Sequence, residues 1–305
     1  MRSPATAVRG NFLGAAGTAG FLALTLHGRG LWTHPTLWGW LAAGALGGGF
    51  LAARVRMIQM PELVALFNGI GGAASTIVAM LALRSDGSAA DLAARIAALL
   101  AVAIGALTFS GSLVAVLKLA RVFGSRPAAF RGHGALNLAL LVGLLAACIF
   151  GGRSRPSDVP LWSAGTLALA LAAGLIAMLR VGGADMPVSI SFLNALSGVA
   201  AAVAGYAVAN PVPVAVGALV GAGGLMLTGD MCRAMNRRLG DVLAGRLAST
   251  EAPGDSAAAA ASAPSPVSAA IERDPVALLR AARRVVIIPG YGMALAQAQP
   301  AVRRL

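Results

Sequence analysis

The sequence predicts an all-α polytopic membrane helix bundle of about eight spans, followed by a linker and a truncated start of a Rossmann-like α/β domain. Three observations predict this fold class. Of the 305 residues, 58% are hydrophobic and only 11% are charged, whereas soluble domains carry about 25% charged residues. Long apolar runs recur between residues 11 and 230, and a strand-like run with a glycine turn follows at residues 285–295. We therefore expect an integral membrane body joined to the first part of a nucleotide-type fold.

The membrane body is predicted from apolar runs of about twenty residues, the length at which a helix crosses the hydrocarbon core. Eight such runs occupy residues 11–27, 36–53, 61–83, 92–117, 134–150, 161–180, 187–209 and 212–230. The run at 11–27 is short and rich in glycine, and a tight Asn-Pro turn at residues 210–213 separates the last two. The chain holds 39 glycines, and small residues let membrane helices approach closely where lipid provides no hydrophobic force for association.

The basic residues predict the orientation of these spans. Loops on one side hold 13 of them, and loops on the other side hold four, namely Arg29, Arg84, Arg153 and Arg155. The 13 are Arg2, Arg9, Arg54, Arg56, Lys118, Arg121, Arg126, Arg131, Arg180, Arg233, Arg237, Arg238 and Arg246. Because positive loops stay in the cytoplasm, both chain ends are expected there, in a bacterial-type inner (plasma) membrane.

The net charge of +13 is explained by this loop asymmetry. A nucleic-acid partner is not expected, because the sequence has no basic stripe interleaved with aromatic residues. No metal is expected either, because His27, His34 and His133 fall at span ends or in loops and form no pair with metal-ligand spacing.

The chain changes character after the last span. Residues 1–247 are predicted to form the transmembrane domain, and residues 248–270 are rich in Ala, Ser and Pro, as in a flexible linker. Residues 271–305 contain a short helix, the strand at 285–288 and the turn Gly290-Tyr-Gly-Met-Ala-Leu295. The glycines Gly290 and Gly292 would let backbone N–H groups approach a pyrophosphate. By itself this turn also fits an ordinary strand–turn–helix, and the twenty residues from the strand onward are too few to complete a cofactor site.

Several separated segments together resemble the beta subunit of the proton-translocating NAD(P) transhydrogenase. The resemblance covers essentially the whole chain and is carried by seven stretches. These are Met60-Pro-Glu-Leu-Val-Ala-Leu-Phe-Asn68, Thr108-Phe-Ser-Gly-Ser-Leu-Val-Ala115, Gly182-Gly-Ala-Asp-Met-Pro187, Leu193-Asn-Ala-Leu-Ser-Gly198, Gly217-Ala-Leu-Val-Gly221, Met231-Cys-Arg-Ala-Met-Asn-Arg237 and Gly290-Tyr-Gly-Met-Ala-Leu-Ala-Gln-Ala-Gln299.

The resemblance implies an activity and its partners. In this family hydride passes between NAD(H) and NADP(H) while a proton crosses the membrane. The resemblance implies NADP(H) on the beta subunit, NAD(H) on a partner alpha subunit, and a dimer of the complex in the lipid bilayer. The NADP(H) contacts would involve the residues of the glycine turn, Gly290, Tyr291, Gly292, Met293 and Ala294. A polypeptide limited to these 305 residues is expected neither to bind NADPH nor to transfer hydride.

Three polar residues inside spans are predicted to line the proton path. Asn68, Ser112 and Asn194 match positions that line it in the family, and polar groups in hydrocarbon are functional candidates. The family often carries His at the position of Asn68, or a titrating His on a helix of the partner subunit. Asn cannot titrate, so Asn68 could only hold water or a hydrogen bond. The alternative for all three is interhelical hydrogen bonding without transport.

Four further residues are predicted to couple the membrane domain to the NADP(H) domain. For Asp185 and Glu62 the alternative is a structural role at a helix start, as a cap or a first-turn carboxylate. For Gly224 it is close helix packing, and for Arg237 an anchor on the positive side of the membrane. Asp230 is expected to form an interfacial ion pair with Arg233.

Two functions of other classes stay open from the residues alone. Gly-rich helices also suit a secondary transporter or proton channel without redox chemistry. The chain could also be a non-functional fragment.

Overall fold

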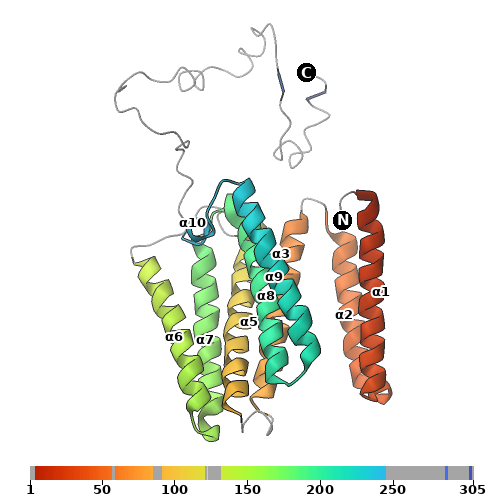
Figure 1. The fold of residues 1–305 in the computed structure, drawn as a ribbon. Coiled ribbons are helices and arrows are strands. Elements are labelled where there is room, and N and C mark those ends of the chain that lie inside the picture. The colour runs from red at the N-terminus through yellow and green to blue at the C-terminus, as the bar shows by residue number, and fades with distance from the viewer. Residues whose placement is uncertain are drawn as a thin grey trace. The chain divides into compact units, whose positions relative to one another are not determined.

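The computed structural model describes residues 4–56, 59–84, 91–120, 122, 132–244, 286–287 and 302–303. These residues fall into two compact units, which divide between Met60 and Pro61. Every regular element among the described residues is a helix (Figure 1).

The first unit contains two long helices. α1 (Pro4–Gly28) is followed by the short 3-10 helix η1 (Leu31–Thr33) and by α2 (Pro35–Arg54). Gly30 adopts φ 65° in the turn, a left-handed conformation that glycine adopts without steric cost. The rings of Trp32 and Trp38 lie 5.3 Å apart, and the Trp38 indole N–H donates to the carbonyl of Trp32 at 3.0 Å. This aromatic pair fixes the η1 turn to the start of α2.

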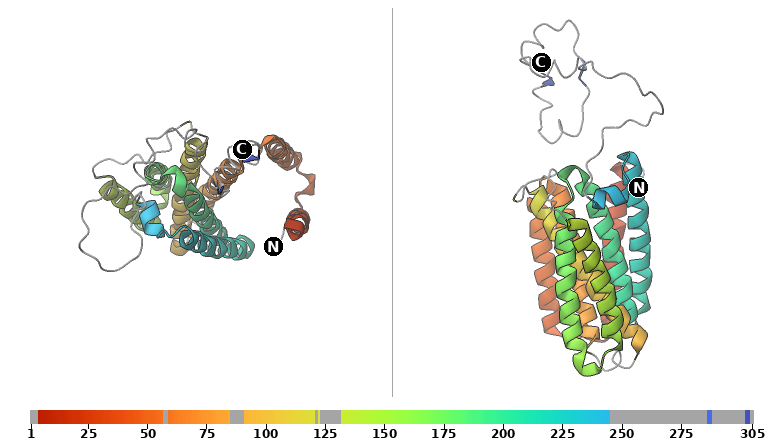
Figure 2. Two further views of the ribbon diagram at one scale, coloured as in Figure 1. Left: turned by 90° about the horizontal axis from the view of Figure 1, so that it is seen from above. Right: turned by 90° about the vertical axis from the view of Figure 1, so that its left-hand side faces the viewer.

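The second unit is an up-and-down bundle of six long helices. They are α3 (Met60–Ala82), α5 (Leu92–Leu119), α6 (His133–Arg153), α7 (Val159–Leu179), α8 (Met186–Ala207) and α9 (Pro211–Ala234). Short 3-10 turns precede α7 (η3, Pro156–Asp158) and α8 (η4, Gly183–Asp185), and a short helix, α10 (Leu239–Leu243), follows α9. The left view of Figure 2 looks nearly along the axes of these helices, and the right view shows them side by side.

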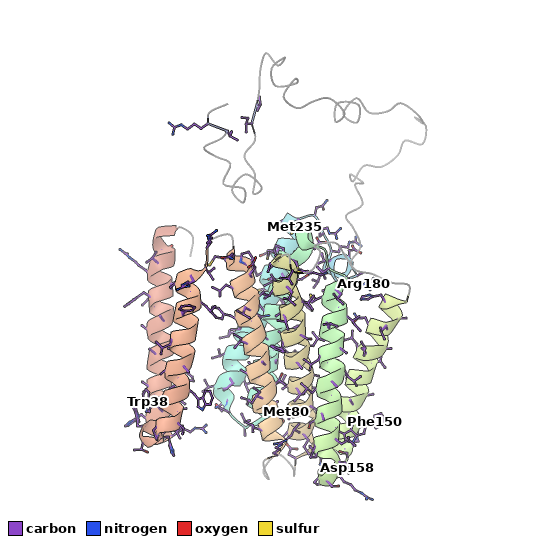
Figure 3. The ribbon with its side chains drawn as sticks, turned by 180° about the vertical axis from the view of Figure 1, so that it is seen from behind. Trp38, Met80, Phe150, Asp158, Arg180 and Met235 are labelled. Atoms are coloured by element: carbon purple, nitrogen blue, oxygen red, sulfur yellow. The ribbon has the colours of Figure 1, made fainter. Side chains whose placement is uncertain are left out.

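The two ends of this bundle are named by residues at them. Figure 3 places Arg180 and Met235 at one end and Phe150 and Asp158 at the other. We call them the Arg180 end and the Asp158 end.

Seven of the eight predicted spans are confirmed as helices long and apolar enough to cross a membrane, namely α2, α3, α5, α6, α7 with its preceding turn, α8 and α9. The run at 11–27 does form a helix, α1, but α1 is not among these seven. Its glycine, threonine, Asn11 and His27 lower its hydropathy, so its role as an eighth span stays a prediction. The linker and most of the predicted Rossmann-like start lie outside the described residues, and Val286 and Ile287 belong to no strand.

Close helix approach is possible because glycines lie where the backbones meet. A Cβ atom placed on Gly72 of α3 would lie 2.7 Å from the Gly105 carbonyl oxygen of α5. A Cβ atom on Gly198 of α8 would lie 2.5 Å from the backbone nitrogen of Gly221 of α9. Neither position has space for a methyl group, so these crossings require glycine. The tight α3–α5 contact lies beside Asn68 and Ser112, and the tight α8–α9 contact lies beside Ser197.

α5 is the most buried of the candidate spans, and each of its ends carries a cation that binds a neighbouring helix end. At the Asp158 end, the Arg95 guanidinium donates to the carbonyls of Ser154 and, at 3.5 Å, of Gly151, which terminate α6. At the Arg180 end, Lys118 donates to the last carbonyls of α7. Helix C-termini carry unpaired carbonyls and partial negative charge, so these two cations fix α6 and α7 against α5.

Candidate functional site

A polar cluster lies inside the bundle where α3, α5 and α8 meet. The Asn68 side-chain amide donates to the Ser112 hydroxyl oxygen at 2.9 Å. The Ser197 hydroxyl donates to the Asn68 side-chain oxygen at 2.6 Å. Asn68 is 7% exposed and Ser112 is 1% exposed. The cluster therefore joins three helices through hydrogen bonds that are shielded by the surrounding helices.

The close α3–α5 approach brings Asn68 within reach of Ser112. Gly69 follows Asn68 directly, and a Cβ atom on it would lie 3.1 Å from the Ser112 Cβ atom. One turn further along α3, Gly72 lies against the backbone of α5 at Gly105. The short Asn side chain can span such a narrow interface. Gly69 and Gly72, which follow Asn68 in the sequence, are thus part of how the cluster is assembled.

Asn194 joins the cluster through its backbone. Its carbonyl oxygen accepts from the Ser197 hydroxyl at 2.9 Å, and its side chain is half-buried. The structure brings Asn68 and Ser112 into direct contact, their role in a proton path stays a prediction, and Ser197 was missed. Its signal was present in the sequence, because Ser197 lies three residues after Asn194 in a predicted span and so shares its helix face.

The cluster has a specific hydrogen-bonding capacity. Asn68 uses both its donor and its acceptor, and none of the side chains of Asn68, Ser112 and Ser197 titrates near neutral pH. The single hydroxyl proton of Ser197 faces two acceptors, the Asn68 side-chain oxygen at 2.6 Å and the Asn194 carbonyl at 2.9 Å. One proton shared between two acceptors allows two hydrogen-bond arrangements of similar geometry.

An ion pair lies at the Arg180 end. The Arg237 guanidinium donates to the Asp185 carboxylate at 2.9 Å, and the two side chains are only 10% and 17% exposed. Asp185 stands at the N-cap position of α8, but its side chain makes no cap hydrogen bond. The alternative that the Asp185 side chain caps α8 is therefore wrong, because the carboxylate turns to the guanidinium instead.

The C-terminus of α9 places Arg237 for this pair. Asn236 adopts φ 51°, the left-handed conformation that ends many helices and that Asn tolerates. The Arg237 N–H then donates back to the Cys232 carbonyl at 2.8 Å, which reverses the chain. α10 follows at once, and its Val242 side chain is fully buried with Met186 and Val181. The pair is thus covered by apolar packing at the α8–α9 end.

The other two predicted coupling residues have different surroundings. Glu62 is half-buried in the first turn of α3, and within the described residues no ion pair joins it to Arg237. Gly224 is a packing position, since a Cβ atom on it would lie 2.9 Å from the Ala195 Cα atom. One turn later the buried Thr228 hydroxyl contacts the Gly224 carbonyl at 2.7 Å and the Ser191 hydroxyl at 2.9 Å.

The ion pair predicted between Asp230 and Arg233 is confirmed, with its atoms 3.5 Å apart and side chains 72% and 86% exposed. Gly290, Tyr291, Gly292, Met293 and Ala294 lie outside the described residues. Within the described part of the chain, no three His, Cys, Asp or Glu residues gather as a metal site would require.

The two ion pairs offer a matched test of burial. We expect Asp185→Asn to lower the free energy of unfolding by about 2 kcal/mol, because it removes one charge of an ion pair whose two side chains are largely buried. Asp230→Asn removes the same charge from an exposed pair near the C-terminus of α9, where a change of at most about 0.5 kcal/mol is expected. Thermal unfolding of both variants in one detergent measures the difference. Equal melting temperatures for the two variants would show that the Asp185 pair contributes no more than a surface pair.

Comparison with known proteins shows the family of the chain. The family model described as NAD(P) transhydrogenase beta subunit matches residues 1–305. The NAD(P) transhydrogenase subunit beta of Rhodospirillum rubrum, and that of its strain ATCC 11170, are each 35% identical over 340 aligned positions. The alignment covers 100% of this chain and 66% of each relative. The chain thus spans just under two thirds of the length of these relatives. A match over every residue of the chain shows that it belongs to the NAD(P) transhydrogenase beta subunit family.

Proposed function

We propose that this chain is the membrane part of the beta subunit of a Re/Si-specific, proton-translocating NAD(P) transhydrogenase. Hydride would pass between NAD(H) and NADP(H) while a proton crosses the membrane. The observation that carries the proposal is the Asn68–Ser112–Ser197 cluster, buried where three membrane helices meet. Buried polar groups of this kind mark ion paths in membrane proteins.

The proposed organisation follows the composition of the chain. Residues 1–247 form the membrane domain, residues 248–270 the linker and residues 271–305 the start of the NADP(H)-binding domain. α1 would be the eighth span, which places both ends of the described chain on the cytoplasmic side. The partners would be an alpha subunit that binds NAD(H) and a second copy of the complex, in a bacterial-type inner membrane.

NADP(H) would accept or supply the hydride, and the protein would position it. The glycine turn at Gly290 and Gly292 would hold the cofactor in the intact subunit. Because that turn lies outside the described residues, the steps below involve the membrane residues alone. For a polypeptide limited to these 305 residues we expect no change in melting temperature with NADPH.

Proton passage at the cluster would proceed through neutral groups. The hydroxyls of Ser112 and Ser197 can each accept one hydrogen bond while donating another, and the Asn68 amide can orient them but cannot hold a proton. A switch of the Ser197 proton between Asn68 and Asn194 would change which oxygen is free to accept. The titrating group would lie outside the cluster.

Coupling between the membrane domain and the NADP(H) domain would depend on α8, because α8 takes part in both the ion pair and the polar cluster. Its N-terminal end holds Asp185 in the ion pair with Arg237 of the α9 end, and three turns later it holds Ser197 in the cluster. The tight contact at Gly198 and Gly221 keeps α8 and α9 together, so displacement of one helix is transmitted to the other. A change in the domain that follows α9 would thereby alter the hydrogen bonds of Ser197.

A substitution at Asn68 tests the proposal. We expect Asn68→Leu, of similar volume, to lower proton-coupled transhydrogenation about tenfold, because two lost hydrogen bonds raise the barrier to proton passage by roughly 1–2 kcal/mol. The measurement is proton uptake during transhydrogenation in vesicles that contain the subunit with its partners. Ser75→Ala is the control, because Ser75 lies on the exposed face of the same helix and donates only to its own Gly71 carbonyl. Full coupled activity of Asn68→Leu would contradict the proposed path.

A further inference from the structure

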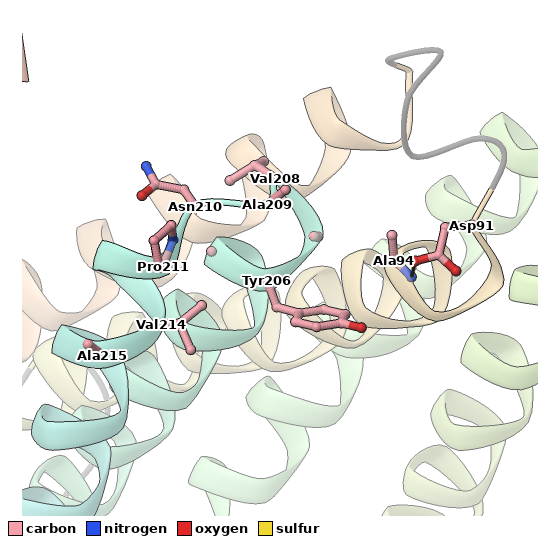
Figure 4. Close-up of a pocket in the computed structure, with 11 residues that line it drawn as sticks. Asp91, Ala94, Tyr206, Val208, Ala209, Asn210, Pro211, Val214 and Ala215 are labelled. Carbon is pink, nitrogen blue, oxygen red and sulfur yellow. Dashed lines mark hydrogen bonds between the residues drawn. The ribbon is translucent and has the colours of Figure 1, made fainter. Parts of the chain in front are cut away.

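A cavity at the Asp158 end has no part in the path described above. Its volume is about 790 Å³, and it lies where α8 turns into α9. The first turn of α5 lines it at Asp91 and Ala94, the α8–α9 turn lines it from Gly205 to Asn210, and α9 lines it at Val214. Figure 4 shows the Tyr206 ring extending from α8 toward the start of α5, where Asp91 and Ala94 lie.

An apolar groove between α5, α8 and α9 adjoins this cavity. This second hollow has a volume of about 510 Å³ and shares Tyr206 and Val214 with the first. Its other lining residues are Ala93, Ile96, Ala97, Leu100, Ala202 and Val203. The Tyr206 hydroxyl is the one side-chain polar group among these lining residues. At this end of the bundle, a cavity that contains the Asp91 carboxylate thus lies beside an apolar groove suited to a hydrocarbon chain.

The rigid turn between the two helices shapes the cavity wall. Ala209 adopts φ 51°, and the Asn210 N–H donates to the Gly205 carbonyl at 2.9 Å, which closes the end of α8. Asn210 then caps α9 by accepting from the Val212 N–H at 3.1 Å. Because hydrogen bonds hold the turn at both of its ends, we expect it to form a rigid wall of the cavity.

The charge at the cavity is negative. Asp91 is its single charged lining residue. The carboxylate accepts from the N–H groups of Ala93 and Ala94 at 3.1 and 3.3 Å, and a carboxylate has about four acceptor positions. The cavity also meets one helix C-terminus and two helix N-termini, whose partial charges sum to about half a positive charge, which is smaller than the full negative charge of Asp91. The full charge on Asp91 therefore sets the preference for a cation that can donate hydrogen bonds.

We propose that this site binds a phospholipid with a primary ammonium headgroup, of the ethanolamine class. The ammonium would donate to the Asp91 carboxylate, and one acyl chain would lie in the groove between Leu100 and Val203. Tyr206, at the boundary of cavity and groove, suits the membrane interface, where tyrosine is enriched. A choline headgroup carries the same charge but no N–H donor, and a glycerol headgroup leaves the lipid anionic, so both should bind less well.

The test is native mass spectrometry of the delipidated full chain with equal amounts of phosphatidylethanolamine, phosphatidylcholine and phosphatidylglycerol. We expect phosphatidylethanolamine to be retained about threefold over phosphatidylglycerol, the scale of one exposed ion pair. Asp91→Asn should remove this preference, because Asn caps α5 as well as Asp does but carries no charge. Asp158→Asn, the same change at the start of α7, should leave the preference intact.

A second variant tests the groove. Ala93→Trp places a large ring where the acyl chain would lie, on an exposed position of α5, and should reduce retention of all three lipids. Equal retention of the three lipids by the unmodified chain, or an unchanged preference in Asp91→Asn, would overturn the proposal. So would a chain that retains no lipid and forms dimers, because a protein helix would then fill the groove. None of these readouts involves transhydrogenation, so they leave the proposed function unaffected.

Discussion

Gly174→Ala is expected to prevent stable assembly of the second unit. A Cβ atom on Gly174 of α7 would lie 2.2 Å from both the Leu107 carbonyl oxygen and the Ser110 hydroxyl oxygen of α5. The first of these atoms belongs to the backbone of the most buried helix, so neither helix can yield locally. We expect a loss of about 3 kcal/mol or more in the free energy of unfolding, at the upper end for overpacking.

Gly165→Ala is the matched control for this prediction. Gly165 lies on the same helix, and a Cβ atom on it would meet no atom within 4 Å. This variant should be neutral or slightly stabilising, because alanine favours helix more than glycine does. Size-exclusion chromatography and thermal unfolding in detergent compare the two. A Gly174→Ala protein that elutes and melts like Gly165→Ala would mean that α5 and α7 lie further apart than described.

The second large effect is expected at Lys118, the one lysine of the chain. Its ammonium donates to the carbonyls of Met178, Leu179 and Val181 at 3.1, 2.6 and 2.8 Å, and the residue is 3% exposed. An ammonium presents three N–H donors in a tripod, which matches three converging carbonyls at a helix end. The planar guanidinium of arginine does not have this geometry.

Lys118→Met keeps the chain length but removes all three donors. We expect it to lower the free energy of unfolding by about 3 kcal/mol. The carbonyls of Leu179 and Val181 each lose a buried donor at a cost of roughly 1–3 kcal/mol, whereas the Met178 carbonyl still accepts from the Val181 N–H at 3.3 Å. Lys118→Arg should recover part of the loss. Arg153→Met is the control, because Arg153 is an exposed cation in the last turn of α6, where about 0.5 kcal/mol is expected. The melting temperatures of the variants in detergent measure these differences in stability. A Lys118→Met protein as stable as Arg153→Met would contradict the capping role of Lys118.

The lost cap should also have a local consequence. The three carbonyls end α7 directly before η4, which ends at Asp185. Freeing this segment would move the carboxylate away from Arg237. Combining Lys118→Met with Asp185→Asn should therefore cost less than the sum of the single changes, as for neighbouring positions in one network.

Hydropathy predicted most of the fold. Seven of the predicted runs match helices within a few residues, because the length of an apolar run is set by the thickness of the hydrocarbon core and needs no knowledge of neighbours. The turn at residues 210–213 was also predicted. In the structure Asn210 caps α9, a position that favours Asn.

Some residues of the candidate site were singled out from the sequence, and others were found only in the structure. The resemblance assigned Asn68 and Ser112 to one path, and in the structure they share a direct hydrogen bond, although their role in the path stays a prediction. Ser197 was missed because a serine in a glycine-rich helix is a common packing residue and has no distinguishing local pattern. Asp185 and Arg237 were each singled out, but their pairing was not, since 52 residues separate them.

The sequence by itself determined that the chain crosses a membrane many times, where its helices begin and end, and which family it resembles. Those properties depend on the transfer of apolar residues from water and on short-range backbone preferences. The tertiary structure alone decided that Ser197 completes the Asn68 cluster, that Lys118 binds the carbonyls at the end of α7 and that the Asp185 carboxylate pairs with Arg237 instead of capping α8. Each of these depends on two or three helices meeting at a glycine contact or a helix end, and such meetings are set by packing between segments far apart in the chain.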